Sequence, residues 1–187
     1  MRTLLLFISL LSVLQLTSCT SPSLRRTSYP DGFLVVTRSP GVTHFAYSGK
    51  RVHSQKADTV GGKTVNYESR KTVASNVRRV PCTEGNGFEV IALIMGLPDG
   101  SHEVEVEAIH PPFLPPQDSH GTVHRRISRV ESKNGIALWG FGWFFDISPH
   151  QVPGKWSIRL NYRGKLIFEE SVIAYLPPAE ATSNHPR

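Results

Sequence analysis

Hydrophobic and polar positions alternate along much of this chain in the way that short β-strands require. The clearest stretch is His102–Ala108, where three glutamates alternate with valine and alanine. Successive side chains on a strand point to opposite faces, so this stretch predicts a strand with one face in a core and its glutamates in water. Phe88–Met95 is a continuous apolar run between glycine-rich turns, which favours a strand buried on both faces. No stretch shows sustained helical periodicity.

The remaining strands are predicted from β-branched and aromatic runs that lie between turn signals. They are expected at Phe33–Thr37, Thr64–Tyr67, Thr72–Ala74, Thr122–Val130, Ile136–Phe145, Lys155–Tyr162 and Leu166–Ile173. Pro98-Asp99-Gly100 predicts a hairpin turn and Arg163-Gly164 a tight one, because proline presets φ and glycine accepts positive φ. A series of about six to nine short strands without helices indicates an all-β fold, a β-sandwich.

The N-terminal residues follow a different pattern. Arg2 supplies a positive charge, and Leu4–Leu14 is an apolar run that is too short for a bilayer, which takes about 20 residues. This combination is typical of a secretory signal peptide. The next residues, Leu16-Thr17-Ser18-Cys19, resemble the lipobox of bacterial lipoproteins. The alternative is an ordinary signal peptide with an incidental cysteine.

The lipobox resemblance implies a specific maturation at Cys19. In that family the signal peptide, here residues 1–18, is removed, the cysteine sulfur receives diacylglycerol, and the new amino group is acylated, for example with palmitate. Several acyl chains anchor a protein permanently, because each buried methylene contributes ~0.8 kcal/mol. Thr20 stands where the family's inner-membrane retention signal has aspartate. The resemblance therefore implies a lipid-anchored protein of the bacterial envelope, in the outer membrane and facing the periplasm if the source has one.

Domain boundaries are predicted from the change of pattern after the lipobox. Residues 19–32 are polar, contain proline and lack an apolar period, which predicts a flexible tether with a reach of roughly 20 Å. Arg25 and Arg26 would either attract anionic lipid or keep this tether solvated. The sandwich is expected over residues 33–176 and a polar tail over 177–187.

The second half of the chain also carries motifs of a known type. They are Gly96–Gly100, His110-Pro111-Pro112, Val152–Trp156 and Tyr162–Lys165. Together they resemble a bacterial family of secreted and lipoprotein domains of unknown function with an immunoglobulin-like fold, over roughly residues 33–176. The resemblance implies an immunoglobulin-like β-sandwich. It implies no activity, because these motifs belong to strands and turns.

Composition and charge narrow the classes of function. The chain has 187 residues, of which 39% are apolar and 19% charged, and its formal net charge is +6. This composition excludes a disordered chain and a collagen-like repeat. The charge falls to about +5 when Arg2 is removed with the signal peptide, and a secreted, tethered chain is not expected to bind nucleic acid.

The most aromatic stretch is Trp139–Phe145. With a period of two, its two tryptophans and two of its phenylalanines share one face, and two glycines lie on the other. The favoured interpretation is a strand whose aromatic face fills the core. The alternative is a shallow surface platform on which Trp139 and Trp143, with Arg125 and Arg126 nearby, bind a glycan or a lipid.

The three glutamates of His102–Ala108 raise the question of a metal site. On a strand, Glu105 lies nearly 7 Å from both Glu103 and Glu107, too far for one calcium ion to be held without loop ligands. Pairing with Arg126 or Arg129 on the next strand is favoured instead.

Other catalytic and metal-binding patterns are weak. His120 and His124 would lie about 13 Å apart on an extended strand, which argues against zinc. No motif of the Gly-x-Ser-x-Gly or His-Glu-x-x-His type occurs. No metal, cofactor or enzymatic activity is therefore expected, with a hydrolase built from dispersed residues as the alternative.

The second cysteine, Cys82, loses any partner in the chain once Cys19 is acylated. A buried, inert thiol is the favoured interpretation, and a disulfide between two chains is the alternative. Taken together, the sequence predicts a membrane-tethered β-sandwich that works as a non-catalytic binding or scaffolding module. Its partner would be an envelope protein or a glycan.

Overall fold

The computed structural model describes residues 23–54, 64–114, 121–146 and 148–178. Within these ranges the chain forms eleven strands and a short 3₁₀ helix, η2 (Ser148–His150). The strands are β1 (Ser23–Ser28), β2 (Leu34–Ser39), β3 (Val42–Ser54), β4 (Thr64–Val77), β5 (Arg79–Pro81), β6 (Asn86–Met95), β7 (Gly100–Ile109), β8 (Val123–Lys133), β9 (Ile136–Phe144), β10 (Gly154–Tyr162) and β11 (Lys165–Tyr175). None of the described residues form a helix with the length and hydrophobicity needed to cross a membrane. The predicted all-β class is confirmed.

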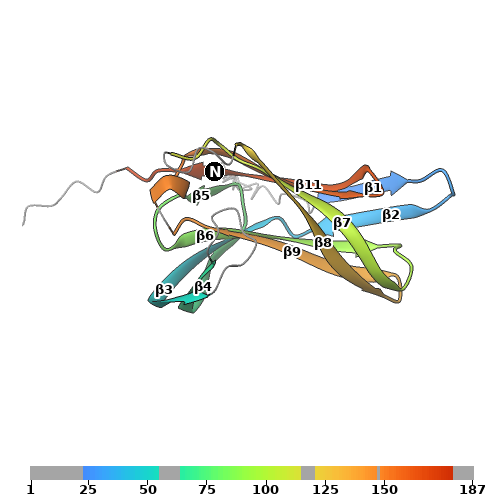
Figure 1. Ribbon diagram of the computed structural model, residues 1–187, viewed down its shortest axis with the longest axis horizontal. Helices are drawn as coiled ribbons and strands as arrows, with labels where there is room; N and C mark the ends of the chain where they lie inside the picture. Colours follow the sequence, from blue (N-terminus) through green and yellow to red (C-terminus); the bar gives the residue numbers. More distant parts are fainter. Residues whose placement is uncertain (1–22, 55–63, 115–120, 147, 179–187) are drawn as a thin grey trace, which may run out of the picture.

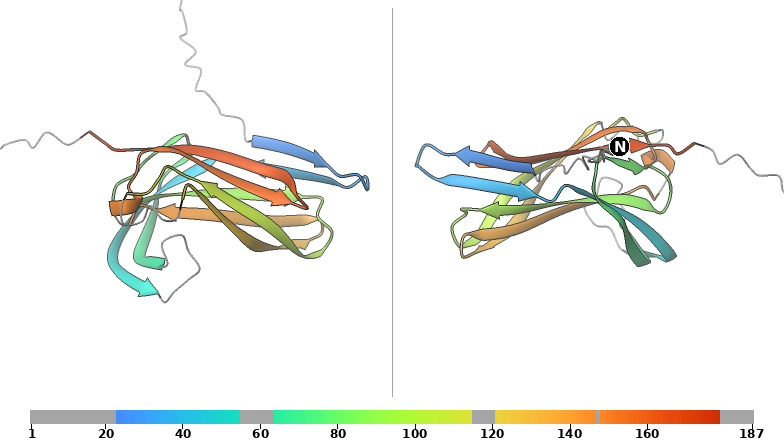
Figure 2. Two further views of the ribbon diagram at one scale, coloured as in Figure 1. Left: turned by 45° about the horizontal axis from the view of Figure 1, so that its top comes forward. Right: turned by 180° about the vertical axis from the view of Figure 1, so that it is seen from behind.

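All eleven strands belong to one curled sheet, whose two halves face each other as in a β-sandwich (Figure 1). The first half has the order β1-β2-β6-β9 and the second the order β8-β7-β10-β11-β5. The halves join at the β8–β9 turn, where Ser132 pairs with Ala137 and Lys133 with Ile136. β3 lies beside β6 and forms with β4 a long hairpin that projects from the body (Figures 1 and 2).

The core lies between the two halves. In β7, Val104 and Val106 are buried while the glutamates between them face outward, as the alternation predicts. From β10, Trp156 is fully buried, and its ring lies 5.8 Å from that of Phe88 in β6. Moving a large apolar side chain out of water contributes ~1.5–3 kcal/mol, so packing alone can hold this fold.

The prediction that Phe88–Met95 is buried on both faces is wrong, because β6 is buried on one face only. Its core face carries Phe88, Val90, Ala92 and Ile94, all buried. Its outer face carries Ile91, Leu93 and Met95, which are partly exposed. The continuous apolar run therefore gives the first half of the sheet an apolar outer surface.

The predicted flexible tether contains a strand. β1 pairs with β2 from Ser23 opposite Ser39 to Ser28 opposite Leu34, and Tyr29 after it is buried. The prediction of a flexible tether is thus wrong for Ser23–Tyr29, which belong to the folded domain. An edge strand such as β1 is held by its backbone hydrogen bonds, which leave no alternating apolar pattern in the sequence.

Pro98-Asp99-Gly100 does not form the predicted hairpin. β6 pairs with β9, and β7 pairs with β8, so this segment crosses from one half of the sheet to the other. It packs on the β8–β9 turn, where Gly135 N donates to Asp99 Oδ1 at 3.0 Å and Gly96 N donates to Gly135 O at 2.8 Å. Turn residues reverse the chain, but they do not select the strand with which the next segment pairs. The tight turn predicted at Arg163-Gly164 is confirmed, with φ of 48° and 71°.

Candidate functional site

Trp139 and Trp143, the residues of the hypothetical aromatic platform, both lie in the core. Their exposed fractions are 4% and 9%. The Trp143 ring lies 4.8 Å from that of Trp156, and the Trp139 ring lies 6.2 Å from that of Phe168 in the opposite half. The core interpretation of this strand is supported, and the platform hypothesis is wrong for these two rings.

Arg125 and Arg126 lie on opposite faces of β8 and cannot form a single anion site. Arg125 Nε lies 2.7 Å from Glu107 Oε1 on the outer face, and this hydrogen bond raises the pKa of the arginine. Arg126 stands opposite Val106 on the inner face, with its guanidinium carbon 5.8 Å from the centre of the Phe141 ring. The adjacent residues diverge because side chains alternate along a strand.

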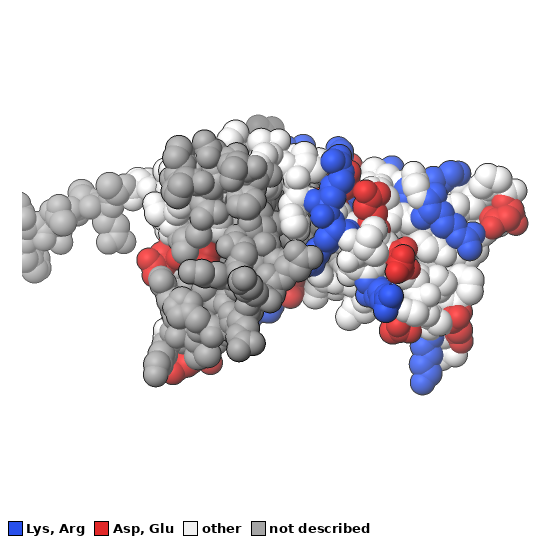
Figure 3. All heavy atoms as spheres, in the orientation of Figure 1, with Lys and Arg blue, Asp and Glu red and all other residues white. Residues whose placement is uncertain are grey.

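The predicted pairing between the β7 glutamates and β8 arginines is found in modified form. Arg129 lies 3.7 Å from Glu103, as expected, but the second partner is Arg125 and not Arg126. In the view of Figure 3, basic and acidic side chains are interspersed over the described part of the molecular surface. Such exposed pairs contribute little to stability, because solvent screens them, and they do not concentrate charge of one sign.

Cys82 is fully buried and forms no disulfide. Burial raises the pKa of its thiol, since the charged thiolate is poorly solvated there. Its backbone N donates to Tyr175 O at 2.8 Å, which fixes the residue beside β11. The interpretation as a buried thiol is confirmed, and a thiol without exposed surface cannot reach a second chain while the domain is folded.

Several predictions made from the sequence concern residues outside the described ranges. They are the signal peptide 1–18, the lipidation site Cys19, His120 and most of the tail 177–187. Among the described residues, no group of three or more histidine, cysteine or carboxylate side chains could hold a metal ion.

The sequence interpretation missed a buried cluster of two histidines and three other aromatic residues. This tryptophan–histidine cluster consists of His110, Phe113, Trp143, His150 and Trp156. The His110 ring stacks on Phe113 at 4.1 Å and an interplanar angle of 13°. The His150 ring lies 4.6 Å from that of Phe113 and 5.3 Å from that of Trp143. Its members come from β9, β10, η2 and the segment after β7, so no local sequence pattern could have predicted the cluster.

The polar atoms around His150 do not form a complete acid–base arrangement. His150 Nδ1 lies 3.6 Å from Asp146 Oδ1, which is near but too long for a hydrogen bond. The other ring nitrogen, Nε2, is buried and has no hydrogen-bond partner, and neither have the indole N–H groups of Trp143 and Trp156. No hydroxyl or thiol of the described residues therefore completes a nucleophilic set on His150.

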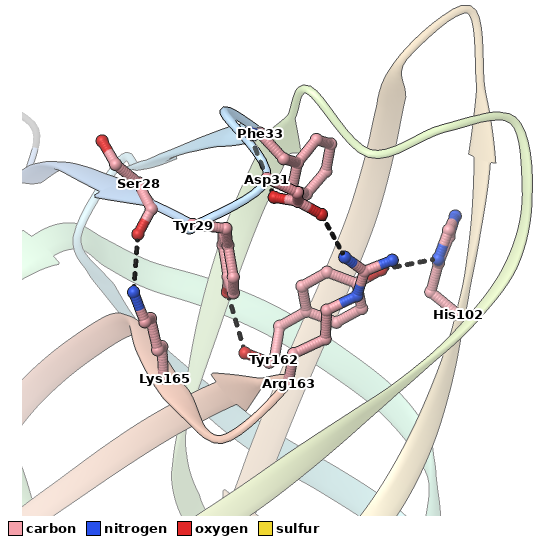
Figure 4. Close-up of polar contacts among 8 residues, drawn as sticks. All are labelled: Ser28, Tyr29, Asp31, Phe33, His102, Tyr162, Arg163 and Lys165. Carbon is pink, nitrogen blue, oxygen red and sulfur yellow. Dashed lines mark hydrogen bonds and ion pairs between the residues drawn. The ribbon is translucent and has the colours of Figure 1, made fainter.

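A second polar network closes the opposite end of the sandwich (Figure 4). Tyr29, in the turn after β1, donates its hydroxyl to Tyr162 O at 2.8 Å. Tyr162 in turn bonds His102 Nδ1 at 3.2 Å, and His102 Nε2 donates to Pro98 O at 2.7 Å. Since a carbonyl can only accept, His102 Nε2 carries a proton, and in the neutral ring Nδ1 accepts from the Tyr162 hydroxyl.

Charged side chains brace the same end. Arg163 Nη1 lies 3.1 Å from Asp31 Oδ2, and Lys165 Nζ donates to Ser28 O at 2.8 Å. Burial raises the pKa of Tyr29, with the nearby Tyr162 and Asp31 acting in the same direction and Arg163 opposing them. The contacts join the β1–β2 turn to the β10–β11 turn, which Figure 4 shows side by side.

β1 is fixed to both halves of the sheet. Besides its ladder with β2, its side chains bond to β11 across the seam. Arg25 Nε and Thr27 Oγ1 donate to Leu166 O at 3.1 and 3.2 Å, and Ser23 Oγ donates to Glu170 Oε2 at 3.3 Å. Ser23 is therefore part of the folded body of the domain and not part of a loose extension.

Comparisons with known proteins add little beyond the fold. No family model matches the chain. No curated protein matches it either. Among solved structures, the chain is similar to an immunoglobulin-like protein from Pseudomonas aeruginosa, with 13% sequence identity, a TM-score of 0.45, and coverage of 70% of this chain and 96% of that one.

Proposed function

We propose that this chain is a lipid-anchored protein of the bacterial envelope, whose sandwich works as a non-catalytic binding or scaffolding module held close to the membrane. Cys19 of the lipobox-like sequence would carry the lipid. Residues 33–176 would be a member of the uncharacterised family of envelope domains that they resemble.

One observation carries the proposal furthest, namely that β1 begins at Ser23. Four peptide units separate Cys19 from Ser23, and a fully extended chain covers at most ~3.3–3.6 Å per residue. The lipid would therefore lie within about 14 Å of the first strand, however the intervening residues are arranged. Because β1 is bonded to both β2 and β11, an anchor at Cys19 would restrain the whole domain.

Binding fits the described residues better than catalysis does. Of the described side chains, His150 and Asp146 come nearest to a catalytic acid–base pair. His150 Nε2, however, has no hydrogen-bond partner. The two exposed arginine–glutamate pairs of β7 and β8 are neutral overall. These features suit a rigid module more than a hydrolase.

The test is acylation of the full chain expressed in a Gram-negative host fed with an alkyne analogue of palmitate. We expect label on the wild type and none on Cys19→Ala, with the matched Cys82→Ala variant still labelled. Mass spectrometry should place diacylglycerol on an N-terminal cysteine at position 19. Processing at another site, or label that survives in Cys19→Ala, would contradict the proposal.

The binding role needs a separate experiment, since lipidation alone does not assign one. Crosslinking in intact cells, followed by identification of attached proteins or glycans, should recover a reproducible envelope partner with the wild type. Turnover of a substrate by the purified protein that is lost in His150→Gln would instead favour the hydrolase.

A further inference from the structure

The outer face of the first half-sheet is largely apolar and includes β1, the first strand described. The ladders align Arg26 with Val36, Val36 with Met95, and Met95 with Ile136. The next row runs through Leu24, Arg38, Leu93 and Leu138. We call these two rows, together with Leu34, the β1–β9 face. Figure 2 (right) shows β1, β2 and β6 side by side.

Several large apolar side chains stand open on this face. The exposed fractions are 57% for Leu24, 44% for Leu34, 49% for Ile136 and 66% for Leu138. Scattered apolar residues on a surface are ordinary, but a contiguous group marks a contact surface. This group spans four neighbouring strands, about 14 Å at ~4.8 Å per strand spacing.

The charges on the face have one sign. Arg26 and Arg38 lie within the two rows, and none of the residues that the ladders place in those rows is acidic. Apolar side chains with interspersed arginines suit the interface of a bilayer that contains anionic lipid. Two copies of the chain packed symmetrically through the same face would bring their arginines toward one another, which disfavours a second copy as the occupant.

The position of the anchor selects the same surface. Leu24 is the second residue of β1, and five peptide units separate it from Cys19, so a lipid attached there would lie within about 18 Å of Leu24. The opposite half of the sheet presents its mixed-charge face, with the Arg125–Glu107 and Arg129–Glu103 pairs, away from this strand.

We propose that the β1–β9 face docks onto the surface of the membrane that holds the lipid anchor, with its leucines at the headgroup–acyl boundary and its two arginines on anionic headgroups. The inference rests on the proposed lipidation of Cys19. Docking would leave the β7–β8 face and the β3–β4 hairpin available to a partner.

The test uses the full mature chain, purified with its lipid and reconstituted in vesicles of phosphatidylethanolamine and phosphatidylglycerol. A polarity-sensitive fluorophore is attached to Leu138→Cys on the face. The matched control is Ile127→Cys on the outer face of β8, where the exposed fraction is 62%. The introduced thiol is the reactive one, because Cys82 is buried and Cys19 would be acylated.

We expect the label at position 138 to shift to shorter wavelength and to be quenched by brominated lipids, and the label at 127 to do neither. Arg38→Glu should reduce the quenching at 138, whereas Arg129→Glu, with the same change of charge on β8, should not. If both labels stay unquenched while the protein remains on the vesicles, docking is overturned and lipidation stands. A spectral shift without bromolipid quenching would indicate contact with another protein copy and also overturn docking. If mass spectrometry finds no acyl group on Cys19, the proposed function itself fails, and the docking inference fails with it.

Discussion

The hydroxyl of Tyr29 donates a hydrogen bond to the carbonyl oxygen of Tyr162 at 2.8 Å, and this buried contact joins the first hairpin to the far half of the sheet. The two rings also lie 5.9 Å apart in an edge-to-face arrangement. The N-terminal hairpin is therefore an integral part of the domain. A lipid attached to Cys19, four residues before the first residue of β1, would therefore restrain the whole domain.

Tyr29→Phe should destabilise the protein. It keeps the ring packing but leaves Tyr162 O buried without its donor, which costs about 1–3 kcal/mol. Urea denaturation should show a lower midpoint with an unchanged slope. Tyr175→Phe is the control, because Tyr175 is only half-buried and its ring, 4.8 Å from the Arg79 guanidinium carbon, is kept in the variant. Equal stability of Tyr29→Phe and wild type would contradict the role of the contact.

Stability should fall at alkaline pH through the same residue. The folded-state pKa of Tyr29 is raised above 10.0 because burial favours the neutral phenol. A raised pKa means that the contribution is fully present below the unfolded pKa, about 10, and is lost as the pH rises through the folded-state value. Unfolding free energies measured from pH 8 to 11 should therefore decline less steeply in Tyr29→Phe than in wild type. Parallel curves would refute this linkage.

Cys82 should be inert in the folded protein. Its thiol is buried and its pKa is raised by desolvation from 9.0, so little reactive thiolate is present at neutral pH. We expect a chromogenic disulfide reagent to modify it only after addition of denaturant, at the rate of global or local unfolding. Rapid modification of the native protein, or a dimer band on a non-reducing gel, would show that the thiol is accessible.

The fluorescence of the three tryptophans should be that of side chains shielded from water. Trp139, Trp143 and Trp156 are all buried, so native emission should lie at short wavelength and resist iodide, and unfolding should shift it to longer wavelength. Strong iodide quenching of the native protein would contradict the packing of β9.

Gly96→Ala should be far more damaging than Gly100→Ala. Both glycines have positive φ, 93° and 121°, and a side chain there costs roughly 1–2 kcal/mol in backbone strain. At Gly96 an added Cβ would also overlap the backbone carbonyl of Leu34, whereas at Gly100 nothing lies within 4 Å. Thermal unfolding of the two variants separates strain from overlap. Similar melting temperatures would mean that β2 can move away at no cost.

The strands whose burial alternates could be predicted well. In β7 the glutamates and valines fall on the expected faces, and in β9 the aromatic residues share the core face. β1 was missed because an edge strand buries little, so its sequence remains polar. In β3, Val42, His44 and Phe45 are buried, but they do not follow a strict alternation that would have marked a strand. The tryptophan–histidine cluster and the Tyr29–Tyr162 contact join residues far apart in the chain, and no local signal points to them.

By itself, the sequence determined the class of fold, the turn at Arg163-Gly164 and the inward face of β9, because side-chain alternation and backbone φ are local properties. Only the tertiary structure decided which strands pair, that Pro98-Asp99-Gly100 bridges two half-sheets, and that Arg125 and Arg126 belong to different surfaces. Pairing depends on which distant segments together bury the most apolar surface, and a local pattern does not contain that information.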